Sequence, residues 1–224
     1  MGKLFIIPTP IGNLGDITYR AVDVMKQLDL LLAEDTRKTG LLLKHYGIEI
    51  KMKSHHQANE HQTLTTIIDR LKNGENIGLV TDAGMPGISD PGFLLVREGL
   101  KEGIEIDCLP GPTAFLPALV LSGIPSDRFH FEGFLPHKKG RKTRLENLAE
   151  YPYTLIFYES PHRLLKTLEQ LAEHFGKDRF ASVSRELSKM YEETRRGMLE
   201  ELISFFSDQK PRGEFVIVVS GKTN

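Results

Sequence analysis

Short apolar runs rich in β-branched residues alternate with amphipathic segments through the first half of the chain. The runs are predicted as strands and cover residues 3–9, 30–34, 48–54, 76–81 and 104–109. Residues 17–28 and 59–72 carry apolar side chains at the spacing of one helix face. This alternation is typical of a mostly parallel sheet with crossover helices, so the first half is predicted to be α/β.

The second half has a different rhythm. Strands are predicted over residues 154–159, 179–184 and 214–220, with 192–196 as a further candidate, and helices over 139–149, 161–174 and 199–206. Ser122-Gly123-Ile124-Pro125 is the best candidate for a domain boundary. The predicted fold is α/β with two tandem domains, residues 1–122 and 123–224, and the cleft between them is the expected ligand site.

Composition places the chain among ordinary soluble proteins. Apolar residues make up 40% and charged residues 26% of the 224, which excludes a disordered chain and a coiled coil. No run approaches the roughly 18 apolar residues of a membrane helix, and the first residues stop being apolar too early for a signal peptide. The single cysteine, Cys108, indicates a reducing cytoplasm. With 29 basic against 30 acidic residues, any polyanion must be bound by a local basic patch.

Two glycine-containing loops follow predicted strands of the first half, where α/β folds bind ligands. Residues 8–16 match neither a dinucleotide nor a phosphate-loop pattern, so a structural turn and a ligand loop remain equal alternatives. Residues 81–92 contain three glycines, with Asp82 and Asp90 flanking the turn. Glycine lets a ligand approach the backbone, and a strand-end carboxylate can hold a hydroxyl or an ammonium group. The alternative is a rigid loop in which Asp90 caps the next helix.

Other polar groups of the first half have plain structural explanations. The acids of Glu34-Asp35-Thr36-Arg37 can cap a helix and pair with Arg37. His55, His56 and His61 are adjacent or five apart, which is not the spacing of a helical zinc site. They are interpreted as solvated or hydrogen-bonded histidines, and no metal site is predicted.

The second half contains two polar strand ends and one basic run. Residues 157–163 and 183–189 place polar groups after predicted strands, with Arg–Glu pairing as the structural alternative. No acidic residue occurs between Gly133 and Leu145, whereas a solvated helix face normally mixes signs. The run is therefore interpreted as a polyanion contact, with a solubilising loop as the alternative. Its basic residues are Lys138, Lys139, Arg141, Lys142 and Arg144. Phe129, Phe131 and Phe134, just upstream, suit base stacking or core packing equally well.

Eight motifs occur in order along the whole chain. They are Pro8-Thr9-Pro10-Ile11-Gly12-Asn13-Leu14, Glu34-Asp35-Thr36-Arg37, Asp82-Ala83-Gly84, Ser89-Asp90-Pro91-Gly92, Leu109-Pro110-Gly111-Pro112, Glu132-Gly133-Phe134-Leu135-Pro136, Phe157-Tyr158-Glu159-Ser160 with His162-Arg163, and Arg212-Gly213-Glu214. Together they resemble the bacterial ribosomal RNA small-subunit methyltransferase I family, in the tetrapyrrole-methylase superfamily. Met85 stands where many members have threonine, and Pro161 interrupts the Glu-Ser-x-His-Arg stretch.

The resemblance implies S-adenosylmethionine-dependent methylation of a cytidine ribose 2′-hydroxyl in the decoding region of 16S ribosomal RNA. It also implies a cytoplasmic homodimer of the tetrapyrrole-methylase fold, with the methyl donor between two α/β domains and no metal or membrane. Two alternatives remain: a tetrapyrrole-precursor methylase of the same superfamily, and a non-catalytic ribosome-binding factor. Only the RNA substrate and the ribosome-binding factor give the basic run a use.

Site residues follow from the resemblance and from strand-end position. The donor is expected against Pro10, Asp82, Gly84, Met85, Thr113, Ala114, Tyr158 and Glu214. Glu186 or Glu159 is the candidate general base, which needs a raised pKa near neutrality. RNA contacts are expected from the five residues of the basic run and from His162, Arg163, Arg185 and Lys189.

Overall fold

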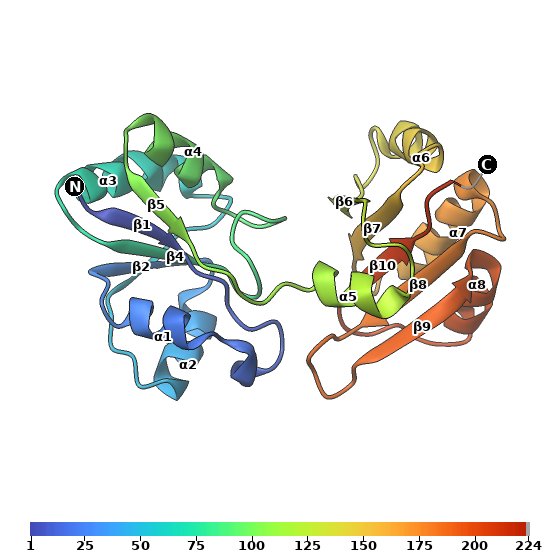
Figure 1. Ribbon diagram of the computed structural model, residues 1–224, viewed down its shortest axis with the longest axis horizontal. Coiled ribbons are helices and arrows are strands. Elements are labelled where there is room, and N and C mark those ends of the chain that lie inside the picture. Colours follow the sequence, from blue (N-terminus) through green and yellow to red (C-terminus); the bar gives the residue numbers. More distant parts are fainter. Residues whose placement is uncertain (223–224) are drawn as a thin grey trace. The chain divides into compact units, whose positions relative to one another are not determined.

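The structure, a computed structural model, describes residues 1–222 and contains two compact units, Met1–Thr113 and the remainder from Ala114 on (Figure 1). The sequence predicted the division after residue 122. The structure places it before helix α5 (Phe115–Ser122), because this helix packs on strands of the second unit. The glycine-proline signal at residues 123–125 therefore marks the end of a helix rather than the domain boundary.

The first unit contains a five-stranded sheet with the order β3-β2-β4-β1-β5. Every neighbouring pair is parallel, which confirms the predicted α/β unit. The strands are β1 (Lys3–Ile6), β2 (Leu30–Ala33), β3 (Met52–Ser54), β4 (Ile77–Val80) and β5 (Glu105–Cys108). The central strands β2 and β4 are buried along their whole length, as expected for a sheet that is covered on both faces.

Helices cover both faces of this sheet, with α1 and α2 on one face and α3 and α4 on the other (Figure 1). They are α1 (Tyr19–Met25), α2 (Thr36–His45), α3 (Glu60–Lys72) and α4 (Phe93–Lys101), and a 3₁₀ turn, η1 (Leu14–Asp16), precedes α1. Each face has its own apolar core. Ile67, Leu71 and Leu95 contribute to one core, whereas Met25 and Leu43 contribute to the other.

The second unit contains a mixed five-stranded sheet with the order β6-β7-β10-β8-β9. Strands β6 and β7 are parallel, and the other three neighbouring pairs are antiparallel. The strands are β6 (Phe129–Phe134), β7 (Thr154–Glu159), β8 (Phe180–Arg185), β9 (Glu193–Met198) and β10 (Phe215–Val219). The helices are α5, α6 (Arg141–Ala149), α7 (Leu164–Phe175) and α8 (Leu199–Ser207).

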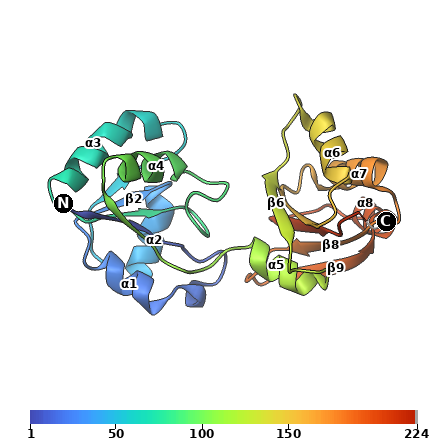
Figure 2. The ribbon, with the colours of Figure 1, turned by 45° about the horizontal axis from the view of Figure 1, so that its top comes forward.

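One core fills the face of the second sheet that α6, α7 and α8 cover (Figure 2). Leu145, Leu168 and Leu202 reach it from the three helices, and Phe157 and Ile217 from the sheet. Helix α5 packs against β7, β8 and β10 without contributing to this core. No helix among the described residues is long and apolar enough to cross a membrane.

The sequence does not predict residue ranges for α2, α4 and β6. Helices α2 and α4 are anticipated only as helices that Glu34-Asp35 and Asp90 could cap, because their own apolar patterns are short. Strand β6 was treated only as a source of aromatic side chains. Its register shifts between Phe131 and Gly133, where φ of Gly133 is +68°, so the bulge interrupts the alternation that predicts a strand.

Candidate functional site

The parallel sheet of the first unit has its topological switch point between β2 and β4. Helix α2 leads from β2 outward to β3 on one face, and α4 leads from β4 over β1 to β5 on the other (Figure 1). Ligands of open α/β sheets bind beyond the strand ends at such a point. Here the residues after β2 are Glu34 and Asp35, and those after β4 are Thr81 and Asp82.

Asp82 joins the two strand ends. Its Oδ1 accepts a hydrogen bond from the backbone N of Asp35 at 3.1 Å, and its own backbone N donates to Glu34 Oε2 at 3.3 Å. Lys38 Nζ lies 2.5 Å from Asp82 Oδ2, and this hydrogen bond raises the pKa of Lys38. Lys38, three residues after Asp35, was not singled out from the sequence, because only the fold brings it to Asp82.

Asp35 and Arg37 have the structural role that the sequence allowed. Asp35 caps α2 by accepting from the backbone N of Arg37 at 2.9 Å, and its other oxygen lies 2.7 Å from Arg37 Nη2. The side-chain hydrogen bonds from Arg37 hold the pKa of Asp35 far below its usual range. Asp35 is therefore a fixed anion at the start of α2.

The loops after β1 and β4 are hydrogen-bonded to each other. Thr9 and Gly84 form an antiparallel bridge with N–O distances of 3.0 and 2.9 Å, and Thr9 Oγ1 donates to the carbonyl of Thr81. Gly84 has a φ of +85°, which favours glycine. The bridge brings together three predicted donor-binding positions, Pro10, Gly84 and Met85.

The loop after β5 lies against the loop after β1. A Cβ on Gly111 would be 2.8 Å from Cβ of Pro8, so the proline ring lies against the Gly111 backbone and leaves no room for a side chain there. Thr113 follows and ends the first unit. The predicted donor-binding residues of this unit therefore lie along the carboxyl edge of β4, β1 and β5, and Asp82 extends the row to β2.

This edge also carries an unmet hydrogen-bonding group. Thr81 is 2% exposed, and its Oγ1 has no partner among the described residues. Because buried polar groups are normally paired, and the half-buried side chain of Asp82 lies beside Thr81, the edge suits a polar ligand with hydroxyl or ammonium donors.

The remaining donor-binding candidates belong to the second unit. Ala114 is the N-cap residue of α5. Tyr158, in β7, packs its ring against Phe131 and Phe134 at centroid distances of 5.1 and 5.6 Å. Glu214 is exposed just before β10. Phe131 is thus part of an aromatic cluster, while Phe134 and Phe129 remain partly exposed.

Glu186, Lys189 and Glu214 form one cluster. Lys189 Nζ donates to Glu186 Oε1 at 2.9 Å and to Glu214 Oε2 at 2.8 Å, and the backbone N of Glu214 donates to Glu186 Oε1 at 3.0 Å. Burial acts to raise the pKa of Glu186, but the hydrogen bonds from Lys189 and from Glu214 outweigh it and lower the pKa. This is the opposite of what a general base near neutrality needs.

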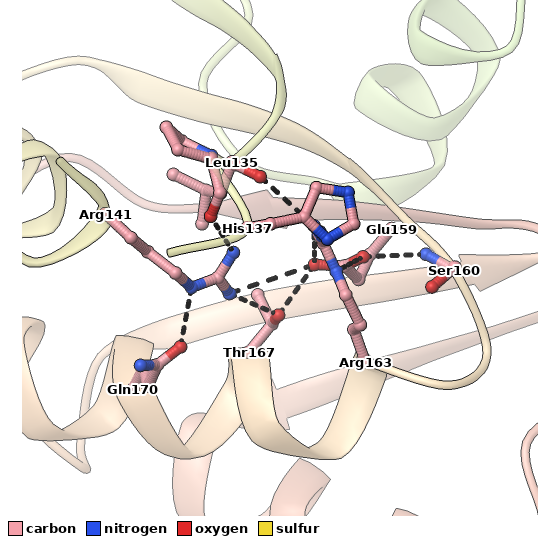
Figure 3. A network of polar contacts seen from close by, with 9 residues as sticks. Leu135, His137, Arg141, Glu159, Ser160, Arg163, Thr167 and Gln170 are labelled. Atoms are coloured by element: carbon pink, nitrogen blue, oxygen red, sulfur yellow. Dashed lines mark hydrogen bonds and ion pairs between the residues drawn. The ribbon is translucent and has the colours of Figure 1, made fainter. Parts of the chain in front are cut away.

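Glu159 ends β7 and is almost fully buried in a polar network (Figure 3). Arg163 Nε and Nη2 donate to its two oxygens at 2.9 and 3.0 Å, and Thr167 Oγ1 and the backbone N of Ser160 donate at 2.7 and 2.8 Å. Arg141 Nη2 lies 3.9 Å away. Both Glu159 oxygens accept hydrogen bonds and lie out of solvent, so the Arg–Glu pairing that the sequence left open is present. The base role of Glu159 stays a prediction.

The basic run divides into buried and exposed residues. Arg141 is 6% exposed, and burial lowers its pKa. Arg144 Nε donates to Glu132 Oε1 at 2.7 Å. By contrast, the side chains of Lys138 and Lys139 are exposed and have no hydrogen bond or ion pair with any described residue, and the Lys142 side chain has only a 3.8 Å contact with Glu146.

Among the other expected RNA contacts, Arg163 points inward to Glu159, whereas His162 is exposed. Arg185 is half-buried, and its Nε has no partner among the described residues. The side chains of Arg141 and Arg163 are thus largely buried, whereas the Arg144 side chain is 42% exposed. Their RNA contacts stay predictions.

The histidines follow their structural interpretation. His55 is 1% exposed, and its Nδ1 lies 2.9 Å from Thr63 Oγ1. Burial lowers the pKa of His55 to about 4. His61 is exposed on α3. No cluster of side chains that could hold a metal ion occurs in residues 1–222.

The sequence profile of the tetrapyrrole (corrin/porphyrin) methylases matches residues 3–203. The chain belongs to this family. Within it, ribosomal RNA small subunit methyltransferase I of Thermotoga maritima is 47% identical over 222 residues, which are 99% of this chain and 100% of that protein. The protein of the same name from Escherichia coli O157:H7 is 48% identical over 223 residues, 98% of this chain and 78% of that protein. The resemblance inferred from the motifs is thereby confirmed.

Solved structures of tetrapyrrole methylases share the fold. The uroporphyrin-III-C-methyltransferase from Thermus thermophilus is 20% identical, with a TM-score of 0.68 over 98% of this chain and 94% of that one. The methyltransferase CobJ is 18% identical, with a TM-score of 0.74 over 99% and 95%. Tetrapyrrole methylases use S-adenosylmethionine, which is the cofactor of this chain as the motifs implied.

Proposed function

We propose that this methylase transfers a methyl group from S-adenosylmethionine to the 2′-hydroxyl of a cytidine ribose in the decoding region of 16S ribosomal RNA. The observation that carries the proposal is near-full-length identity of 47–48% to proteins named for small-subunit ribosomal RNA. We include a homodimer and the bacterial cytoplasm in the proposal, because the ordered motifs resemble a family with both properties.

On the donor side, we propose that the carboxyl edge of the first sheet binds S-adenosylmethionine. The proposed contacts are Pro10, Asp82, Gly84, Met85 and Thr113, with Ala114, Tyr158 and Glu214 from the second unit. A bound donor supplies the methyl group on a sulfonium. Asp82, which contacts Lys38, can accept hydrogen bonds from hydroxyl or ammonium groups, and the bridged loops of Thr9 and Gly84 offer backbone groups at the same edge.

On the acceptor side, the residues have to align the ribose hydroxyl with the methyl group for an in-line displacement. We propose that Lys138, Lys139 and Lys142 bind RNA phosphates and that His162, Arg185 and Lys189 orient the nucleotide. Lys189 stays protonated between Glu186 and Glu214, since these carboxylates raise its pKa against the effect of burial. Its charge therefore suits a phosphate contact rather than proton removal, and the general base stays unassigned.

The deciding experiment is methyl transfer from radioactive S-adenosylmethionine to three acceptors: purified small ribosomal subunits, naked 16S RNA and a tetrapyrrole precursor. We expect label in RNA, at a ribose 2′-oxygen of cytidine. Label in the tetrapyrrole alone would replace the proposal by the small-molecule alternative. Donor binding without transfer to any acceptor, together with binding to subunits, would support a non-catalytic ribosome factor.

A further inference from the structure

Two arginine side chains, Arg163 and Arg141, hold the loop between β6 and α6 by hydrogen bonds. Arg163 Nη2 donates to the carbonyl of Leu135 at 3.2 Å, and Arg163 Nη1 lies 2.9 Å from His137 Nδ1. Arg141 Nη1 donates to the carbonyl of Pro136 at 3.1 Å. Three successive residues are therefore tied down immediately before Lys138 and Lys139, which are exposed (Figure 3).

Both arginines are in turn held by groups on β7 and α7. Arg163 forks onto the two oxygens of Glu159, and Arg141 donates from Nη2 to Thr167 Oγ1 at 2.7 Å and from Nε to Gln170 Oε1 at 2.8 Å. Thr167 Oγ1 in turn donates a hydrogen bond to Glu159 Oε2 at 2.7 Å. Glu159 thus accepts hydrogen bonds from Arg163 and Thr167, and it is the carboxyl group of a network that contains two guanidinium groups.

The network also sets the hydrogen-bonding state of His137. Because a guanidinium N–H can only donate, His137 Nδ1 accepts from Arg163 and the ring proton resides on Nε2. His137 is exposed, so this N–H donor is presented on the same loop as the two lysines. A phosphate oxygen or a base acceptor is the chemistry that such a donor and two ammonium groups recognise together.

We propose that Glu159, acting through Arg163 and Arg141, is a positioning residue that preorganises the loop of residues 135–140 for RNA, and that His137 is an additional RNA-contact residue. The inference deepens the proposed function and rests on it. A loop that is already ordered loses less conformational entropy on binding, which strengthens binding without any new contact.

The main test compares Arg163→Lys with Arg179→Lys. Lysine at residue 163 keeps the charge near Glu159 but loses the fork that reaches Leu135 and His137. Arg179 is a matched control, since it is also half-buried in the second unit and donates to a carbonyl, that of Ser220, at 3.2 Å. It has no contact with the loop. Glu159→Gln removes the carboxylate itself and leaves the Arg163 guanidinium without its charged partner. Arg163→Lys is the less disruptive variant, because it leaves no buried guanidinium unpaired.

Two measurements report on the loop and on its use. Trypsin cleavage after Lys138 and Lys139, followed by mass spectrometry without RNA, reports loop order, and we expect it to be roughly tenfold faster in Arg163→Lys. Methyl transfer to small subunits reports the RNA role, and we expect KM for subunits to rise about tenfold with kcat and donor affinity retained. His137→Ala should raise the same KM without faster cleavage, and Arg179→Lys should change neither quantity.

The outcomes distinguish a failure of the positioning role from a failure of the proposed RNA methylation. Unchanged cleavage in both Arg163→Lys and a folded Glu159→Gln would overturn the positioning role. Faster cleavage with an unchanged KM for subunits would overturn its link to RNA, and an unchanged KM in His137→Ala would remove His137 from the contact surface. A wild-type chain that neither binds nor methylates small subunits would overturn the proposed function, whatever the cleavage rates.

Discussion

Glu186 occupies the space that a side chain at Gly213 would need. A Cβ at residue 213 would lie 2.5 Å from Cδ of Glu186, and the φ of Gly213 is +91°. The backbone N of Glu186 donates to the carbonyl of Glu214 at 3.0 Å, and the backbone N of Glu214 donates to Glu186 Oε1 at the same distance. The end of β8 and the turn before β10 are thus interlocked through this pair.

Gly213→Ala is expected to destabilise the protein by roughly 2–4 kcal/mol, because a left-handed backbone and a steric overlap act together. Gly123→Ala is the control: Gly123 also has a positive φ, +70°, but no atom lies within 4 Å of its Cβ position. It should lose only about 1 kcal/mol. Urea unfolding measures both, and equal losses would show that Glu186 does not fill the site.

His55 should make stability depend on pH. Its pKa is about 4 when folded, below the value of 6.5 of an unperturbed histidine, because it is buried as the neutral form. The unfolded chain therefore binds the extra proton between these values. The contribution is fully present above about pH 6.5, is lost as pH falls toward about 4, and amounts to roughly 3 kcal/mol.

The free energy of unfolding, measured at a series of pH values for the wild type, His55→Gln and His61→Gln, checks this prediction. His55→Gln should flatten the slope between about pH 6.5 and 4.5. His61 is exposed on α3, so His61→Gln should leave the slope unchanged. A slope that survives in His55→Gln would assign the pH dependence to other groups.

Asp82→Ala is expected to weaken binding of S-adenosylmethionine by more than about 1 kcal/mol, because it removes charge-assisted hydrogen bonds at the switch point. Calorimetric titration measures the affinity. Lys38→Met should have a smaller effect, since Asp82 keeps its bond from the backbone N of Asp35. Asp69→Ala, on the exposed side of α3, is the control. Unchanged affinity in Asp82→Ala would move the donor site elsewhere.

Glu186→Gln is expected to lower turnover on small subunits by less than about tenfold, whereas loss of a general base lowers rates by roughly 10²–10⁴-fold. The reason is the lowered pKa of Glu186, which leaves a weakly basic carboxylate held by Lys189. The pH–rate profile of the variant should match that of the wild type. A loss of 10²-fold or more, with donor affinity intact, would restore Glu186 as the base.

The exposed lysines should set the salt dependence of RNA binding. Replacing Lys138, Lys139 and Lys142 by glutamine should flatten the slope of log affinity against log salt by about 2 units, at about 0.7 per phosphate contact on single strands. Filter binding to small subunits measures the slope. A triple variant at Lys26, Lys44 and Lys51, which are exposed in the first unit, is the control. Equal slopes in wild type and loop variant would make the run a solubilising surface.

Local pattern determined much of the fold. Apolar runs and amphipathic helix patterns are each set by a few neighbouring residues. The sequence alone therefore predicts the parallel first sheet and the strands β1, β2, β4, β5, β7, β8 and β10. The motif order also identified the family and its cofactor. Where the pattern is broken, as at the Gly133 bulge of β6, the strand escaped prediction because the alternation is interrupted by the extra residue.

For several charged residues, burial and partner were decided only by the tertiary structure. Arg141 and Lys142 are neighbours in one basic run, yet Arg141 is buried against Gln170 and Thr167, and Lys142 is exposed. Glu159 is a candidate base from its strand-end position, and the structure shows it almost fully buried and hydrogen-bonded to Arg163. Arg141 lies 29 residues before Gln170, whereas Arg163 lies 4 residues after Glu159, and both contacts depend on how β7, α6 and α7 pack together. The sequence therefore determines which chemical group each side chain carries, whereas the folded protein determines how far that group is buried and which partner it contacts.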